Sequence, residues 1–196
     1  MAGPDRLGQG WRVKLGEREG HPIMALSEMK ADTAISDPLA HLRAEHARQR
    51  DICDRLDDLI AKMDIGALTP EVADILTFLN QDLAWHIADE EHDLFPTLGE
   101  RCTKSDRFPA LLRQLQHEHE MDIDLVDFLR DDLEVLAGGS TLANPTRLLI
   151  NLREFTATQR RHLEWEDTAV LPLADARLTD ADRDILAARM RARRGA

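Results

Sequence analysis

Along most of the chain, hydrophobic and polar residues alternate with the period of an α-helix. From about residue 36, apolar side chains recur at steps of three and four, which is typical of helices that bury one face. The first apolar stripe contains Leu39, Leu42, Cys53, Leu56, Ile60 and Met63. Gly66 marks its expected end, and Thr69 with Pro70 provides the cap and first turn of a second helix.

The same pattern predicts two more long helices after the first. The second stripe contains Leu76, Leu79, Leu83 and Leu94. We expect the second helix to close near Pro96 and Gly99, where proline and glycine interrupt the stripe. The third helix is expected from about Ser105 to the pair Gly138 and Gly139, which cannot easily continue it.

The fourth helix opens at Asn144 with a proline in its first turn, and Pro172 is expected to tighten or kink its end. A short fifth helix is predicted from the cap residue Thr179 to about Arg194. Four long helices joined by short connections usually pack as an antiparallel bundle. The hydrophobic content of 43% with only 4% aromatic residues also favours helices over a sandwich or barrel.

The pattern therefore predicts an all-α protein with three parts. Residues 1–35 are rich in glycine, show no sustained period, and are interpreted as an N-terminal extension. Residues 36–175 form the expected antiparallel up-down four-helix bundle. Residues 176–196 are expected to form a short accessory C-terminal helix.

Charge and cysteine content narrow the functional classes. A net charge of −12 disfavours a nucleic-acid or anionic-membrane partner, because both reward Lys and Arg. The two cysteines are too few for a disulfide framework, and Cys53 is interpreted as a small buried apolar residue, with a redox role as the alternative. We recognise no long apolar run and no secretory leader, so we predict a soluble cytoplasmic protein. The last helix carries a basic cluster that is interpreted as complementing its dipole: Arg189, Arg191, Arg193 and Arg194.

Polar residues occupy a few positions in the four stripes where the pattern demands apolar side chains. They are His46, His86, Glu90, His119, His162 and Glu166. An isolated carboxylate inside a bundle is strongly disfavoured unless it is paired or bound to a cation. The pattern from His86 to Pro96 recurs from His162 to Pro172, with His and Glu four residues apart in both copies. Residues at that spacing share a helix face, so each copy presents a nitrogen and an oxygen ligand together.

We therefore expect one shared metal centre in the core of the bundle. The two glutamates would bridge two metal ions and the four histidines would be terminal ligands, as in a variant of the carboxylate-rich di-iron bundles. Imidazole with bridging carboxylate suits iron best, and manganese and zinc are the alternatives. The expected cofactor is thus two non-haem iron ions with an oxo or hydroxo bridge. Six protein ligands for two metals leave open positions for a small ligand.

The same residues resemble the hemerythrin-like HHE cation-binding family over roughly residues 36–175. The resemblance is carried by a His in helix one, the segment from His86 to Pro96, Glu118-His119 in helix three and a His-x-x-x-Glu in helix four. Oxygen-carrying hemerythrins have a second His on helix three where this chain has Leu115, so the resemblance does not imply simple oxygen carriage. The four-His, two-Glu set looks more like the iron-centre repair and the iron- or oxygen-sensing branches. The paired-cysteine motif of the repair proteins has no counterpart in this chain.

The predicted site supports two functional hypotheses. In the first, the chain is a non-haem di-iron protein that binds or reacts with O2, nitric oxide or peroxide, in oxygen or nitric oxide sensing or in a stress response. In the second, it is an iron-, oxygen- or redox-responsive regulatory module that acts through a protein partner. A metal-free helical scaffold is a third interpretation, and it is disfavoured because half-satisfied buried polar networks are costly.

Residues beside the six are interpreted from their positions. Glu45 and Glu118 each precede a histidine and are either carboxylates that orient an imidazole or solvated acids. Glu91 is expected to face solvent, with a ligand role in place of Glu90 as the alternative. The remaining histidines of the bundle are interpreted as bystanders: His41, His92 and His117.

Overall fold

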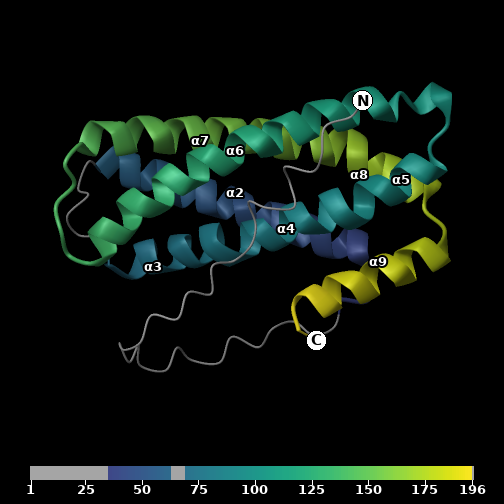
Figure 1. Cartoon of the computed structure of the whole chain (residues 1–196), viewed down its shortest axis with the longest axis horizontal. Helices are drawn as coiled ribbons and strands as arrows, with labels where there is room; N and C mark the ends of the chain where they lie inside the picture. Colours follow the sequence, from purple (N-terminus) through teal and green to yellow (C-terminus); the bar gives the residue numbers. More distant parts are fainter. Residues whose placement is uncertain (1–34, 63–68, 196) are drawn as a thin grey trace, which may run out of the picture. The chain divides into compact units, whose positions relative to one another are not determined.

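The computed structural model describes residues 35–62 and 69–195, and all regular structure in these ranges is helical. Four helical arms lie side by side, and a shorter helix packs against them (Figure 1). The all-α bundle expected from the sequence is therefore confirmed. Nearly all of the expected N-terminal extension (1–35) and the expected helix end at Gly66 lie outside the described residues, and the three-part division of the chain stays a prediction.

The arms differ in how many segments build them. The first arm is α2 (Pro38–Lys62). The second consists of α3 (Thr69–Thr77), the π-helical segment η1 (Phe78–Asp82), α4 (Leu83–Asp89), the π-helical segment η2 (Glu90–Leu94) and α5 (Phe95–Arg101). The 3-10 turn η3 (Lys104–Asp106) leads to the third arm, α6 (Phe108–Ala137). The fourth consists of α7 (Pro145–Trp165), the π-helical segment η4 (Glu166–Val170) and α8 (Leu171–Arg177), and α9 (Asp180–Arg193) follows it.

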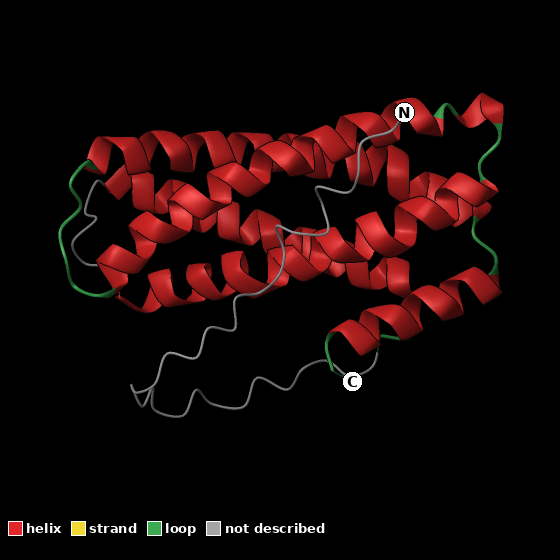
Figure 2. Cartoon of the chain, in the orientation of Figure 1, coloured by secondary structure: helices red, strands yellow, loops and turns green. Residues whose placement is uncertain are grey.

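Successive arms run in opposite directions, as the colours of Figure 1 and the loops of Figure 2 show. α2 packs against α7, α7 against α6, and α6 against α3. Each arm buries its apolar stripe in the shared core, and every fully buried Leu or Phe contributes roughly 1.5–3 kcal/mol relative to an exposed one. Examples from the four arms are Leu42, Leu56, Leu83, Leu94, Leu115, Leu129, Leu152 and Phe155.

Two helices, α7 of the bundle and the C-terminal α9, begin at the caps expected from the sequence, Asn144 and Thr179. The side chain of Asn144 accepts a hydrogen bond of 3.0 Å from the backbone N–H of Arg147 at the start of α7. Thr179 forms a capping box with Asp182 at the start of α9. The third arm begins at Phe108 rather than near Ser105. Thr103 and Asp106 form the capping box of the short turn η3, and Arg107, which follows η3, adopts a left-handed conformation that separates this turn from α6.

Proline does not close the second helix, contrary to expectation. Pro96 lies in the first turn of α5, which continues to Arg101, and Pro172 occupies the same position in α8. A π-helical segment precedes each proline, and in each the backbone N–H that follows bonds back to the glutamate that opens the segment, Glu90 or Glu166. A π-helical turn is wider than an α-helical turn, so it has room for the proline ring and tolerates the N–H that proline lacks. The arm therefore continues past the proline.

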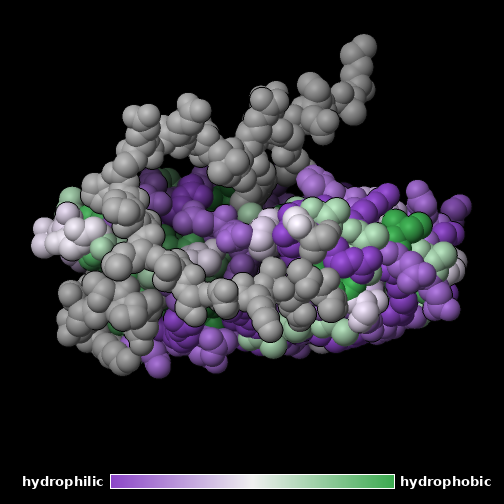
Figure 3. Space-filling view, turned by 90° about the horizontal axis from the view of Figure 1, so that it is seen from below, coloured by the Kyte–Doolittle hydropathy of each residue, from purple (hydrophilic) through white to green (hydrophobic). Residues whose placement is uncertain are grey.

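An apolar cluster fills one end of the bundle. It includes Leu39, Leu42, Phe95, Phe108, Leu115, Val170, Leu171, Leu186 and Met190, so α9 shares this core with the four arms. Cys53 is also fully buried, and burial raises the pKa of its thiol to about 12, which agrees with its interpretation as a small apolar residue. On the face seen in Figure 3, the described surface that is in view is mainly hydrophilic, with hydrophobic residues in small separate areas. Across the described ranges, every helix is too short or too polar to traverse a bilayer.

Candidate metal centre

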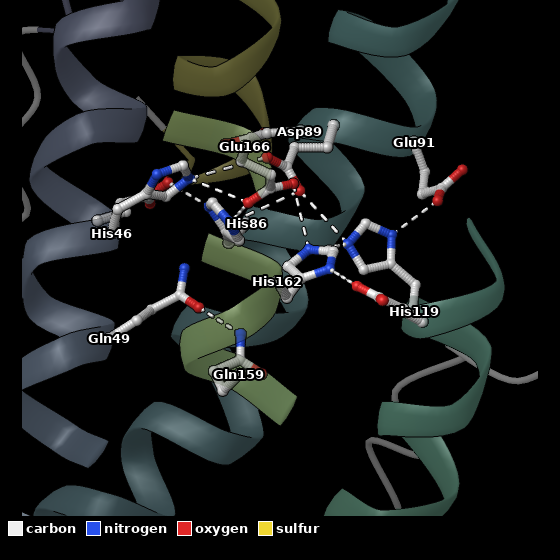
Figure 4. Close-up of polar contacts among 12 residues, drawn as sticks. His46, Gln49, His86, Asp89, Glu91, His119, Gln159, His162 and Glu166 are labelled. Atoms are coloured by element: carbon white, nitrogen blue, oxygen red, sulfur yellow. Dashed lines mark hydrogen bonds and ion pairs between the residues drawn. The ribbon is translucent and has the colours of Figure 1, made fainter. Parts of the chain in front are cut away.

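The six residues singled out in the sequence converge in the middle of the bundle (Figure 4). They are His46 on α2, His86 on α4, Glu90 at the start of η2, His119 on α6, His162 on α7 and Glu166 at the start of η4. None of them exposes more than 3% of its surface. The structure therefore brings all six predicted residues together and leaves none outside.

The ligand atoms of these residues form two overlapping groups. The first half-site contains His46 and His86, the second contains His119 and His162, and both include the carboxylates of Glu90 and Glu166. Within each group, one nitrogen or oxygen atom per residue lies within 4.8 Å of all the others. Two pairs of imidazoles around two shared carboxylates are a donor arrangement suited to a bridged pair of metal ions.

Both carboxylates lie between the half-sites. Oε2 of Glu166 is 3.3 Å from Nε2 of His46, and its Oε1 is 3.2 Å from Nε2 of His162. Oε2 of Glu90 is 3.6 Å from Nε2 of His86 and 3.5 Å from Nε2 of His119. These separations are at or beyond the upper limit of good hydrogen bonds. The carboxylate oxygens face a common centre without a hydrogen-bond partner, whereas Nε2 of His119 and Nε2 of His162 lie 3.0 Å apart, within hydrogen-bond distance of each other.

Several atoms at this centre have no hydrogen-bond partner in the described part of the chain. Nε2 of His46, Nε2 of His86 and both carboxylate oxygens of Glu90 and Glu166 are buried and unpartnered. Buried polar atoms in folded proteins almost always have a partner, and unpartnered charged oxygens are especially costly. The donor set fits one or two cations, which would satisfy these atoms.

Each imidazole of the first half-site donates a hydrogen bond to a carboxylate on the side of the ring that faces away from the centre. Nδ1 of His46 donates to Oδ1 of Asp167 at 2.7 Å, and Nδ1 of His86 donates to Oε2 of Glu45 at 3.2 Å. A hydrogen bond from Nδ1 to a carboxylate orients the ring and raises its basicity. It also leaves Nε2 as the nitrogen that faces the centre.

The second half-site repeats this arrangement. Nδ1 of His119 donates to Oε1 of Glu91 at 2.7 Å, and Nδ1 of His162 donates to Oε2 of Glu118 at 3.0 Å. Phe95 stacks on the ring of His119 with centroids 6.1 Å apart, which further fixes the plane of the imidazole. All four histidines are therefore oriented before any ligand arrives.

The four orienting carboxylates follow one rule of sequence and space. Each is the immediate neighbour of one of the six central residues, and each reaches a histidine on another arm. The histidine of the second arm bonds a carboxylate on the first arm, that of the third arm a carboxylate on the second, and that of the fourth arm a carboxylate on the third. The histidine of the first arm bonds a carboxylate on the fourth. These bonds close a ring around the bundle. The ring consists of Glu45, Glu91, Glu118 and Asp167.

Sequence reasoning found this ring only in part. Glu45 and Glu118 orient imidazoles, which decides between the two interpretations left open for them. The expectation that Glu91 faces solvent is wrong, because its side chain is only 7% exposed and bonds His119. Asp167 was missed, although its place directly after Glu166 matches that of Glu91 after Glu90.

Arginines hold the orienting carboxylates of the first half-site. Asp167 pairs with Arg50, and Oε1 of Glu45 lies 2.7 Å from Nη2 of Arg194. Burial opposes the charged form of Glu45, but the neighbouring His41 and the hydrogen bond from His86 outweigh it and hold its pKa well below the usual range. Both carboxylates are thus kept ionised by neighbouring cations.

Neutral amides hold the orienting carboxylates of the second half-site. Gln116 donates to Glu91 at 2.9 Å, and Gln114 donates to Glu118 at 2.8 Å. The nearest guanidinium nitrogen, on the half-exposed Arg161, is 3.7 Å from Glu118. The hydrogen bond from His162 lowers the pKa of Glu118 to about 2, so this carboxylate is also ionised at neutral pH.

Protons balance the charge at the centre when no cation is bound. Burial favours neutral His86, but the negative charge of Glu90 and the bond to Glu45 outweigh it and raise its pKa to about 9. Burial likewise disfavours the carboxylate form of Glu90, but the facing histidines hold its pKa well below the usual range. A metal ion that binds between them has to displace such protons.

A pair of buried amides borders the centre and was not found from the sequence. Nε2 of Gln159 donates to Oε1 of Gln49 at 2.8 Å, and both side chains are 2% exposed. Gln49 lies one turn after His46 on α2, and Gln159 lies one turn before His162 on α7 (Figure 4). The pair therefore links the two half-sites across the interface between α2 and α7.

The other histidines separate into two kinds. His92 and His117 are exposed, as expected for bystanders. The interpretation of His41 as a bystander needs correction, because its Nε2 lies 3.1 Å from Oε1 of Glu45. His41 thus contacts an orienting carboxylate without facing the centre itself.

A surface groove of about 470 Å³ lies between α6 and α7 beside the second half-site. Its lining includes Glu118, which holds His162, and the buried Asp122. Apolar side chains of Met121 and Phe128 also line it. In this groove, the side chain of Glu118 lies between the solvent and His162 of the second half-site.

The hemerythrin HHE cation-binding domain family matches residues 37–174, which contain all six residues of the centre and the ring around them. No curated protein and no solved structure gives a significant match to the chain. The family match spans more than two thirds of the sequence and coincides with the bundle and its His and Glu groups. The chain therefore belongs to the hemerythrin HHE cation-binding family.

Proposed function

We propose that the protein is a non-haem di-iron protein that binds or reacts with O2, nitric oxide or peroxide. In this proposal the four central histidines are terminal ligands, two to each metal, and Glu90 and Glu166 are shared. The observation that carries it is the pair of His groups that include the same two buried carboxylates. A mononuclear site would need only one of the two groups.

The donor atoms support iron as the metal. Imidazole nitrogen and carboxylate oxygen suit iron and manganese, and no cysteine belongs to either group in the described part of the chain. Two histidines with a carboxylate form the ligand set of many iron sites that keep open positions. Zinc and manganese are the competing metals, and selectivity among them depends on geometry and availability.

The residues around the centre support a reaction with a small ligand. Iron at this site supplies the redox chemistry that O2, nitric oxide or peroxide require. The chain supplies four imidazoles already oriented by carboxylates, and full burial of Glu90 and Glu166 excludes bulk water. The groove that Glu118 lines lies on the side of the second half-site, where a small ligand would have the shortest distance to travel from solvent.

A regulatory role through a partner is the second candidate. It is favoured by the contact between Arg194, the residue directly after α9 and outside the family-matched residues, and Glu45 beside the centre. A change at the metal centre can reach the surface by this contact. Turnover separates the two candidates. Regulation requires metal-dependent binding of a partner without catalytic consumption of O2, nitric oxide or peroxide.

Metal analysis with an absorption spectrum tests the di-iron proposal. Protein loaded with Fe(II) under anaerobic conditions should hold about two irons per chain. Exposure to air should produce the charge-transfer absorption of a di-ferric pair, which should change on reduction or on addition of nitric oxide. A protein that stays colourless and holds no iron contradicts the proposal.

Matched variants sharpen this test. Glu90→Ala and Glu166→Ala remove a shared carboxylate and should lose both irons, whereas His92→Ala removes an exposed histidine two residues from Glu90 and should keep both. Bound iron should also raise the melting temperature, since a ligand that binds only the folded state at 100 times its dissociation constant stabilises it by about 2.7 kcal/mol. An unchanged melting temperature with iron or chelator favours the metal-free scaffold.

A further inference from the structure

The C-terminal helix α9 has its own reason to pack on the bundle. Its apolar face buries Leu186, Ala187 and Met190 in the core cluster, and its capping box fixes its first turn. α9 follows the family-matched residues, which end at 174. The apolar face and the capping box therefore hold α9 on the bundle, and the arginines near its end can have a different role.

Those arginines meet carboxylates that are buried on the second arm. Asp89 and Asp93 are 0% and 4% exposed, a burial that an unpaired carboxylate does not tolerate. Arg193 pairs with both, and its Nη2 is 2.7 Å from Oδ2 of Asp93. Arg189 lies 3.2 Å from Oδ1 of Asp93. The expectation that this basic cluster serves the helix dipole is incomplete, because three of its arginines form specific ion pairs.

Arg194 reaches furthest toward the metal centre. Its Nη2 lies 2.7 Å from Oε1 of Glu45 and 2.8 Å from Oδ2 of Asp89. Its guanidinium carbon is 5.4 Å from the ring centroid of Trp85, within the range of a cation–π contact, and the side chain is only 10% exposed. A planar, weakly hydrated cation is suited to such a buried position between carboxylates.

Glu45 connects this arginine to a central histidine. One carboxylate oxygen of Glu45 contacts Arg194, and the other accepts the hydrogen bond from Nδ1 of His86. His41, Glu45 and Asp89 also form a third group compact enough to surround a cation. The guanidinium of Arg194, directly after α9, contacts two of its three members and so places a positive charge in this group.

We propose that Arg194 is a positioning residue of the metal centre, which fixes the carboxylate of Glu45 and through it the ring of His86. The inference rests on the proposed function only in treating His86 as a metal ligand. Loss of Arg194 leaves Oε1 of Glu45 with His41 as its neighbour, 3.1 Å away, so the carboxylate is held less firmly and the Nδ1–H of His86 loses a fixed acceptor. The fold of the bundle remains, because the apolar face of α9 is unchanged.

The first experiment uses the full-length metal-free protein and the Arg194→Gln variant. The Nδ1–H proton resonance of His86, assigned by its loss in His86→Gln, should be protected from solvent exchange in the wild type. In Arg194→Gln this proton should exchange at least several-fold faster. Arg189→Gln removes the same charge from α9, five residues earlier, where Arg189 pairs with Asp93 rather than Glu45, so it should leave the resonance unchanged. Equal protection in the wild type and Arg194→Gln overturns the inference.

A second variant tests whether Arg194 acts through Glu45. Glu45→Gln should also expose the His86 proton, and adding Arg194→Gln to it should cause no further change, because the two residues lie in one chain of contacts. Independent, additive effects contradict the proposal. This comparison also decides the case in which Arg194→Gln alone alters folding, which circular dichroism detects.

Binding of Fe(II) under anaerobic conditions gives a separate readout. Arg194→Gln should weaken the binding of one of the two ions by about tenfold, the lower end of the effect expected when a residue that orients a metal-bound histidine is disturbed. If the wild type binds no iron while Arg194→Gln still exposes the His86 proton, the di-iron proposal fails and the role of Arg194 stands. If the wild type binds two irons and Arg194→Gln changes neither readout, only the role of Arg194 fails.

Discussion

The two half-sites use the same inner residues but are supported differently. Each has two histidines, each histidine is oriented by a carboxylate, and both share Glu90 and Glu166. In the first half-site the orienting carboxylates are held by the guanidinium groups of Arg50 and Arg194. In the second they are held by the neutral amides of Gln114 and Gln116.

This difference predicts two unequal metal positions. A carboxylate paired with a guanidinium shares less negative charge with an imidazole than a carboxylate bonded only to an amide. The histidines of the second half-site should therefore be the more basic donors. We expect an iron ion bound there to favour the ferric state more strongly than an iron ion bound in the first half-site.

Removal of one histidine should have the largest effect and should test whether the half-sites are separable. His46→Ala should lose the iron of the first half-site and His119→Ala that of the second, because each removes a terminal ligand from only one group. Each variant should hold about one iron by metal analysis, and the double variant none. Loss of both irons from a single variant would show that the positions do not act separately.

Substitution of one orienting carboxylate should have the next largest effect. Glu91→Gln keeps a hydrogen-bond acceptor for His119 but removes the charge, and should weaken iron binding in the second half-site by about 10- to 100-fold. Asp167→Asn should do the same in the first. Competition with a chelator measures both affinities. Glu120→Gln, next to His119 but exposed, is the control and should bind iron like the wild type.

The amide pair that joins the half-sites provides a test of stability. Gln159→Leu leaves the amide of Gln49 buried without its partner, and should lower the free energy of unfolding by about 1–3 kcal/mol. The double variant Gln49→Leu/Gln159→Leu removes both polar groups and should be more stable than either single variant. Urea unfolding of the metal-free protein measures the three values. If the loss of unfolding free energy in the double variant equals the sum of the losses in the two single variants, the two amides do not depend on each other.

Introduction of a guanidinium beside Glu91 should have the smallest effect and should make the half-sites more alike. Gln116→Arg places a guanidinium beside Glu91, which pairs with no arginine in the described part of the chain, so the iron of the second half-site should be easier to reduce. We expect a rise in midpoint potential on the order of 60 mV, a tenfold change in a one-electron equilibrium. Gln116→Leu removes the amide without adding charge and should not raise the potential. An unchanged potential in Gln116→Arg rejects the electrostatic difference between the half-sites.

Local patterns in the sequence were sufficient to predict the helices and most of their ends. The caps Asn144 and Thr179 act through hydrogen bonds to residues three positions away, so they can be recognised without a fold. Pro96 misled the prediction for the opposite reason. A proline usually ends a helix, but the π-helical segment before it widens the turn, and nothing in the local pattern indicates that widening.

The six central residues could also be predicted from the sequence, because each is a polar side chain at a position where an amphipathic helix requires an apolar one. Two of the orienting carboxylates could not, because Glu91 and Asp167 lie beside the buried stripe and become buried only where a neighbouring arm covers them. The same holds for Arg194, which contacts a carboxylate 149 residues earlier in the chain. The sequence by itself determined the helices and the central donors, since both follow from periodicity along one helix. Only the tertiary structure decided how those donors are oriented and charged, since these properties depend on which arms are neighbours.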